Sequence, residues 1–262
     1  MVRYKFCIFL VFIVLLLWSC GPSQRELAVQ KINTAKNVLA TGDTLAALAI
    51  IDSVKILFPE AKVQIGVADN IRKVTLQQMI DQRKLQLIKL DSVIFELEKN
   101  FVKEKTEFDM YWQYNHKQQT LNRSWDRSFL QVHLDERGVM YLSSNYMGKE
   151  WLNHTGIRVY DGQLQAKSER VPVGDALNHR SDFMDYKWER VSYMDGKADS
   201  VIHFIANNSN LNLKCVFLGA RYYYILLEKF DVEAVVDALK LSEAIKKRES
   251  LDAEIEHYDL IL

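Results

Sequence analysis

The chain has 262 residues, and its 34 Lys and Arg balance 34 Asp and Glu, so the formal net charge at pH 7 is zero. This balance leaves no basic footprint of the kind that nucleic-acid-binding proteins carry, which excludes nucleic acid as an expected partner. The length suffices for one large domain or two small ones with a sizeable hydrophobic core.

The N-terminal segment has the pattern of a secretory signal. Arg3 and Lys5 form a short cationic start, and an unbroken apolar run extends from Phe6 to Leu17. Such a run after a positive start, with a small residue before the cleavage point, is typical of a signal peptide. The run is shorter than the roughly 20 residues that a membrane-spanning helix needs. We therefore expect residues 1–19 to be a signal peptide.

The end of this segment, Leu17-Trp18-Ser19-Cys20, resembles the bacterial lipobox. The resemblance implies cleavage between Ser19 and Cys20 and acylation of the Cys20 thiol. The Ser-Cys-Gly ending is similar to that of lipoproteins from Bacteroidetes-type bacteria. The alternative is an ordinary cleaved signal in which Cys20 has no special role.

A lipoprotein assignment implies a stable membrane anchor and an address in the cell envelope. Each buried methylene contributes about 0.8 kcal/mol, and two or more acyl chains anchor stably where one does not. Gly21, rather than Asp, follows the lipidated position, and no acidic cluster comes after it. We therefore expect a lipid anchor in the outer membrane, facing the periplasm. With Cys7 removed and Cys20 acylated, Cys215 is left alone, and no intramolecular disulfide is expected.

Residues 24–59 predict a helical hairpin. Apolar residues recur at helical spacing on both sides of Thr41-Gly42-Asp43, where Gly ends one helix and Asp can cap the next. The hairpin resembles one tetratricopeptide repeat, with Gly42-Asp43 at the turn, Ala47 at a small position and Pro59 at the terminal proline. No second copy follows, and repeat modules need about three units to stack. We expect a hairpin that packs on the next helix rather than a peptide-binding solenoid.

The next stretch, from Ile65 to about Lys105, predicts one long helix. Leu87, Leu90, Ile94, Leu97 and Phe101 alternate in steps of three and four, as in a coiled-coil seam. Two heptads are too few for a confident coiled coil, so an intramolecular stem is preferred over a dimeric rod. Residues 20–105 together form the expected helical stem.

Residues 106–230 predict an antiparallel β-domain. Apolar and polar residues alternate along Ser128–Leu134, and Asp161-Gly162 is a strong hairpin signal. We also expect Tyr186–Met194 to pair with a strand over Val201–Ala206, while the pattern lapses from Val171 to Asp185 and indicates a loop or short helix. Eight or nine strands joined mainly as hairpins favour a sandwich or an up-and-down barrel.

The last segment, residues 231–262, predicts a C-terminal helix over Asp231–His257. It holds 4 basic and 9 acidic residues, whereas residues 20–105 hold 13 basic and 10 acidic ones. This opposite charge suggests that the helix packs back on the stem. The expected fold class is thus α+β: a helical hairpin and a long coiled-coil-like helix, then a β-sandwich or barrel, closed by a C-terminal helix.

The sequence lacks the common catalytic, metal-binding and phosphate-binding motifs. The chain has no His-Glu-x-x-His, no Gly-x-Ser-x-Gly and no phosphate-binding glycine loop, so no catalytic, metal-binding or cofactor-binding residue is predicted. Cys215 lies on the apolar face of a predicted strand, and we expect a buried structural thiol there.

The clearest candidate contact residues are Tyr222, Tyr223 and Tyr224. Alternation along a strand must point at least one of these rings away from the core, so either Tyr223 or the pair Tyr222 and Tyr224 faces outward. Tyr is a common hot-spot residue of interfaces.

These features favour a lipid-anchored envelope protein that acts as a non-catalytic binding or scaffolding module for a protein or glycan. The alternative is a barrel that carries an apolar ligand or lipid. A hydrolase of envelope polymers ranks last, because it would need two acidic residues, or a Cys and a His, converging in a cleft.

Overall fold

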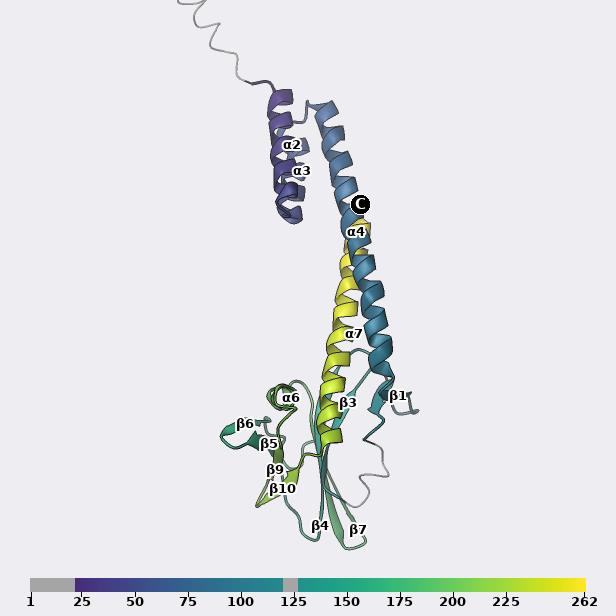
Figure 1. The fold of residues 1–262 in the computed structure, drawn as a ribbon, viewed down its shortest axis with the longest axis vertical. Helices are drawn as coiled ribbons and strands as arrows, with labels where there is room; N and C mark the ends of the chain where they lie inside the picture. The colour runs from purple at the N-terminus through teal and green to yellow at the C-terminus, as the bar shows by residue number, and fades with distance from the viewer. Residues whose placement is uncertain (1–21, 120–126) are drawn as a thin grey trace, which may run out of the picture. The chain divides into compact units, whose positions relative to one another are not determined.

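The computed structural model describes residues 22–119 and 127–262, so the predicted signal peptide and Cys20 lie outside the described residues. The described chain divides into two compact units: residues 22–84 with 255–262, and residues 85–254. Figure 1 shows the elements of each unit. Within the described ranges, no helix combines the length and apolar character that crossing a membrane requires.

The first unit begins with the predicted helical hairpin, α2 (Gln24–Ala40) and α3 (Thr44–Leu57). Ser23 starts α2 with a capping box, in which its hydroxyl and the Glu26 carboxylate each accept from the other residue's backbone N–H. Gly42 turns the chain with a φ of +91°, a conformation that glycine adopts without strain. The Asp43 carboxylate then caps α3 by accepting from the backbone N–H of Ala46 at 3.1 Å.

Small side chains let the helices of this unit approach closely. The long helix α4 (Lys62–Glu98) joins the hairpin through its first turns. The shared core consists of Ala28, Ile32, Ala35, Ile51, Val54, Ala61 and Ala68. Arg72 on α4 donates to the Asp52 carboxylate at 3.0 Å and to the backbone carbonyl of Ile261 at 2.6 Å.

The second unit starts on the C-terminal part of α4, which ends earlier than the expected Lys105. Strand β1 (Phe101–Glu104) follows and pairs with β2 (Gln113–His116) in an antiparallel hairpin. The expectation of a helix through residue 105 was wrong at this end. Phe101 has the right spacing for the helical seam, but it is buried in the β-domain core, where it packs edge-on against Tyr114.

Two four-stranded antiparallel sheets form the body of this unit. One has the order β3 (Phe129–Leu134), β4 (Met140–Gly148), β8 (Tyr186–Tyr193) and β7 (Asn178–Phe183). The other has the order β10 (Tyr222–Leu226), β9 (Lys214–Leu218), β5 (Gly156–Asp161) and β6 (Leu164–Lys167). Both sheets contribute to one core, as in a sandwich. The described strands do not close into a barrel, and the α+β fold class is confirmed.

Two local expectations were wrong. Residues 199–207 form helix α6 (Asp199–Asn207) instead of a strand paired with β8. Its buried side chains, Val201, Ile202 and Ile205, lie on one helical face, because steps of one and three to four residues suit a helix better than the two-residue period of a strand. The stretch that lacked a pattern contains β7, a polar edge strand in which the alternation of apolar residues is missing.

The final helix α7 (Lys229–Ile261) packs its buried side chains into the core of the second unit. Its buried residues there include Val232, Ala234, Val235, Ala238 and Leu241. Ile94 and Leu97 of α4 are half-buried against the same cluster. Arg248 on α7 donates from Nε to the Asp91 carboxylate of α4 at 2.7 Å. Buried Ser242 donates to the backbone carbonyl of Gly138 at 2.6 Å, which fixes α7 to the turn between β3 and β4.

Candidate functional site

The three consecutive tyrosines lie on β10, and the strand alternates as expected. Tyr222 and Tyr224 are 61% and 56% exposed, and Leu226 on the same face is 59% exposed. Tyr223 points the other way, with its ring centroid 5.0 Å from that of Tyr146 in the core. Of the two alternatives left open by the sequence, the outward pair is therefore the one present.

The exposed pair stands on an edge strand that carries no charge. Strand β10 pairs with β9 alone, and its sequence is Tyr-Tyr-Tyr-Ile-Leu. Natural edge strands are usually protected by charged residues, proline or a covering element. The opposite edge of the same sheet, β6, contains Lys167, and the β7 edge contains Arg180 and Asp182. The β10 edge has the features of a contact surface rather than of a protected edge.

Cys215 is fully buried, as expected from its place on an apolar strand face. Burial raises the pKa of its thiol far above the ordinary value, and the nearby Asp231 carboxylate adds to the effect. A thiol held in its protonated form and closed off from solvent is not a reactive nucleophile. In the part of the chain that the structure describes, no three His, Cys, Asp or Glu side chains gather as a metal site would require.

A buried hydrogen-bond network links Ser144, His154 and Glu189. Ser144 Oγ lies 2.8 Å from His154 Nε2, and His154 Nδ1 lies 2.8 Å from a carboxylate oxygen of Glu189. The order hydroxyl, imidazole, carboxylate is that of a catalytic triad. All three residues are no more than 1% exposed, and Ser144 Oγ also bonds the hydroxyl of buried Tyr193 at 2.8 Å. The network was not predicted, and its burial gives it a structural role.

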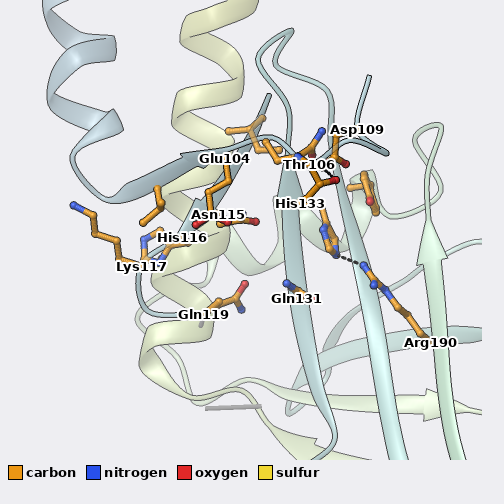
Figure 2. Close-up of a pocket in the computed structure, with 14 residues that line it drawn as sticks. Glu104, Thr106, Asp109, Asn115, His116, Lys117, Gln119, Gln131, His133 and Arg190 are labelled. Carbon is orange, nitrogen blue, oxygen red and sulfur yellow. Dashed lines mark hydrogen bonds between the residues drawn. The ribbon is translucent and has the colours of Figure 1, made fainter. Parts of the chain in front are cut away.

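Figure 2 shows a polar groove on the β3–β4–β8–β7 sheet. Because neighbouring residues of a strand point to opposite faces, its lining residue Arg190 lies on the face opposite to Glu189. Strands β3, β4 and β8 supply its floor through Gln131, His133, Tyr141 and Arg190. The β1–β2 hairpin and the connection between its strands supply the wall. The lining wall residues are Val102, Glu104, Thr106, Asp109, Gln113, Asn115, His116, Lys117 and Gln119. The cavity volume is about 710 Å³, within the usual range for small-molecule sites. We call it the β-domain groove.

Specific contacts hold the wall of the groove in place. Gln119 anchors the end of the hairpin to β3: its amide oxygen accepts from the backbone N–H of Val132, and its amide nitrogen donates to the carbonyl of Leu130, both at 3.0 Å. Asp109 accepts from the backbone N–H and the hydroxyl of Thr106, at 3.0 and 2.6 Å. These hydrogen bonds hold the pKa of the Asp109 carboxyl below its ordinary value.

The alternation predicted along Ser128–Leu134 is one signal for this groove, although no groove was predicted from it. Gln131 and His133 alternate with buried Leu130, Val132 and Leu134, so a polar sheet face could be expected there. The residues on the opposite wall of the groove come from other strands, and sequence spacing alone does not bring them together.

Comparison of the chain with family models, with curated proteins and with solved structures finds no match.

Proposed function

We propose that this protein is a lipid-anchored scaffolding module of the bacterial cell envelope that binds a protein partner through strand β10. The anchor in this proposal is Cys20, which is acylated on its thiol and becomes the first residue when the signal peptide is cleaved, and the membrane is the outer membrane on its periplasmic side. The observation that carries the proposal is the exposure of Tyr222 and Tyr224 on an uncharged edge strand.

The chemistry of this edge favours a protein as the partner. An extended segment can add to an exposed strand edge through backbone hydrogen bonds, while alternate side chains supply specificity. Tyr222, Tyr224 and Leu226 lie two residues apart on one face, so an added strand would meet them in register. Tyrosine covers a large area and loses little side-chain entropy on binding, which suits such a contact.

The alternative carrier function receives less support. A carrier needs an enclosed apolar cavity, whereas the core between the two sheets is filled by Tyr146, Phe217, Leu142 and their neighbours. The β-domain groove is lined mainly by polar side chains, which suit an apolar ligand poorly.

Site-specific photo-crosslinking in native membranes tests the proposal. A photoreactive phenylalanine is placed at position 222 or 224, and for the control at position 164. Leu164 stands on β6, the opposite edge of the same sheet, and is 57% exposed. We expect one discrete adduct with a different protein from positions 222 and 224 and none from position 164.

The same membranes test whether the contact contributes affinity and whether the anchor is lipid. The double substitution Tyr222→Ser with Tyr224→Ser should reduce co-purification of the crosslinked partner at least about 10-fold, as expected when two interface tyrosines are lost, whereas Leu164→Ser should not. Cys20→Ser should release the protein from the membrane fraction. A homodimeric adduct, or equal adducts from both edges, would overturn the partner proposal; retention of Cys20→Ser in the membrane would overturn the lipid anchor.

A further inference from the structure

The β-domain groove is balanced in charge and mixed in hydrogen-bonding character. Its lining has two carboxylates, Glu104 and Asp109, against two cations, Lys117 and Arg190. Apart from Val102, Leu134 and the ring of Tyr141, every lining residue is polar. Lys117 is committed to the scaffold, because its ammonium group donates to the backbone carbonyl of Lys99 at 2.7 Å. An anionic ligand would therefore meet two carboxylates and one cation, Arg190, whose guanidinium bonds only the neutral ring of His133 among the described residues.

The floor of the groove contains a flat, uncharged aromatic stack. His133 and Tyr141 stand directly opposite each other on β3 and β4, and their rings stack at 4.5 Å with an angle of 11°. Burial lowers the pKa of His133 to about 3, and the Arg190 charge adds to this, so the imidazole is neutral at neutral pH. The stack therefore offers an apolar ring surface beside polar groups.

Hydrogen bonds define which tautomer of His133 is present. Arg190 can only donate, and its guanidinium lies 3.4 Å from His133 Nε2, the contact dashed in Figure 2. The hydroxyl of Ser143 lies 2.9 Å from the same nitrogen and already accepts from Asn145. Nε2 is therefore the acceptor, and Nδ1 carries the proton as a donor.

Two floor residues have hydrogen-bonding capacity left over. Arg190 is exposed, and its only hydrogen bond among the described residues is the one to His133. The Gln131 side chain makes no hydrogen bond to the described part of the chain, although it is half-buried. Gln131 can both donate and accept, Arg190 donates, and Glu104 across the groove accepts. These groups match a ligand with many hydroxyls.

From this arrangement we infer that the β-domain groove is a second binding site, for a neutral oligosaccharide. Sugar hydroxyls donate and accept in equal measure, and the C–H face of a pyranose ring packs on an aromatic ring. A groove with balanced charge, an aromatic stack, an amide without a hydrogen bond to the described residues and a guanidinium with donors to spare complements both properties. This site lies on a different sheet from β10, so it is independent of the proposed protein contact.

Saturation-transfer-difference NMR on the full-length protein tests the inference. The probes are neutral oligosaccharides of three to five glucose, mannose or N-acetylglucosamine units, with inorganic triphosphate as the anionic probe. The variants are Gln131→Ala and Arg190→Gln. The control is Arg170→Gln, which removes the same charge from an exposed residue outside the groove lining. Circular dichroism establishes that each variant folds as the parent does.

At least one neutral probe should bind the parent protein. We expect binding to weaken about 5-fold in Gln131→Ala and about 10-fold in Arg190→Gln, the sizes that correspond to one neutral and one charged hydrogen bond, and to stay unchanged in Arg170→Gln. The inference is overturned if no neutral probe gives transfer, if only triphosphate does, or if the folded groove variants bind as well as the parent.

Discussion

Nδ1 of His154 lies 2.8 Å from Oε2 of Glu189, and both side chains are 0% exposed. The carboxylate also accepts from the backbone N–H groups of Leu152, Asn153 and His154, at 2.6, 2.8 and 3.0 Å. Burial pushes the pKa of Glu189 upward, but these hydrogen bonds outweigh burial and hold it below the ordinary value. Because a carboxylate only accepts, Nδ1 carries a proton and donates it to Glu189, while Nε2 shares a hydrogen bond with the Ser144 hydroxyl.

The first prediction concerns this carboxylate. Glu189→Gln keeps the size of the side chain but replaces one carboxylate oxygen with an NH₂ group. That group would face backbone N–H donors of residues 152–154, which bond to the carboxylate in the parent protein. We expect a loss of about 2–4 kcal/mol in the free energy of unfolding, measured by urea denaturation, because buried donors lose their partners. The control is Glu150→Gln, whose carboxylate pairs with Arg221 at the surface; it should change stability by less than about 0.5 kcal/mol. Equal effects of the two substitutions would contradict a structural role for Glu189.

The second prediction concerns the close approach of Gly219 to the segment that Glu189 holds. A Cβ on Gly219 would lie 2.2 Å from the carbonyl oxygen of Leu152 and 3.0 Å from the backbone of His154. Ala220 donates its N–H to the same carbonyl at 2.8 Å. Because backbone atoms cannot move aside, Gly219→Ala should lower the free energy of unfolding by at least about 2 kcal/mol.

A matched substitution of the same kind should have the opposite sign. Gly66 lies in helix α4 with no atom within 4 Å of an added Cβ. Gly66→Ala should stabilise the helix by about 0.5–1 kcal/mol. Differential scanning calorimetry of both variants measures the shifts, and a Gly219→Ala protein that melts like the parent would contradict the packing described for this turn.

The third prediction is a pH dependence that arises from His133. Its pKa is lowered to about 3 in the folded state, whereas an unfolded chain takes up this proton near pH 6.5. The unfolded state therefore binds more protons between these values, and stability falls as the pH falls through this window, by at most about 1.4 kcal/mol per pH unit for one group. The contribution of Glu189, whose pKa is depressed, is lost only below its ordinary value of 4.5.

Replacing His133 isolates its contribution. In His133→Gln the free energy of unfolding should change less between pH 6.5 and 5 than in the parent, as measured by urea denaturation at several pH values. Burial also lowers the pKa of His116, which gives the parent and the variant the same residual slope. Parallel curves for the two proteins would show that His133 titrates normally in the folded state.

Periodicity in the sequence predicted those elements in which the spacing of apolar residues, or a turn residue, is enough to specify the conformation. The alternation of Leu130, Val132 and Leu134 places them on the core face of β3, and all three are at most 5% exposed. Asp161-Gly162 joins β5 to β6 as a hairpin, because Gly162 adopts a φ of +54° there. The outward pair Tyr222 and Tyr224 follows from the same rule of alternation.

Elements whose neighbours decide their conformation were mispredicted. Strand β7 consists mainly of polar residues and is a strand because it pairs with β8, which no local pattern reveals. Helix α6 was predicted to be a strand that pairs with Tyr186–Met194, although its buried face has helical spacing. The β-domain groove could not be predicted either, since Asn115, His133 and Arg190 converge only after three separate segments have folded.

The place of α7 in the core has a consequence for the order in which the β-domain folds. Leu241 and Ala238 pack in the same cluster as Phe101, and every described strand precedes them in the chain. As the chain is synthesised, the described strands β1 to β10 emerge before the helix that packs in their shared core. Contacts between such distant positions slow folding, because a long loop must close before they form. The core of the β-domain therefore cannot be complete until α7 has been synthesised, however early its strands emerge.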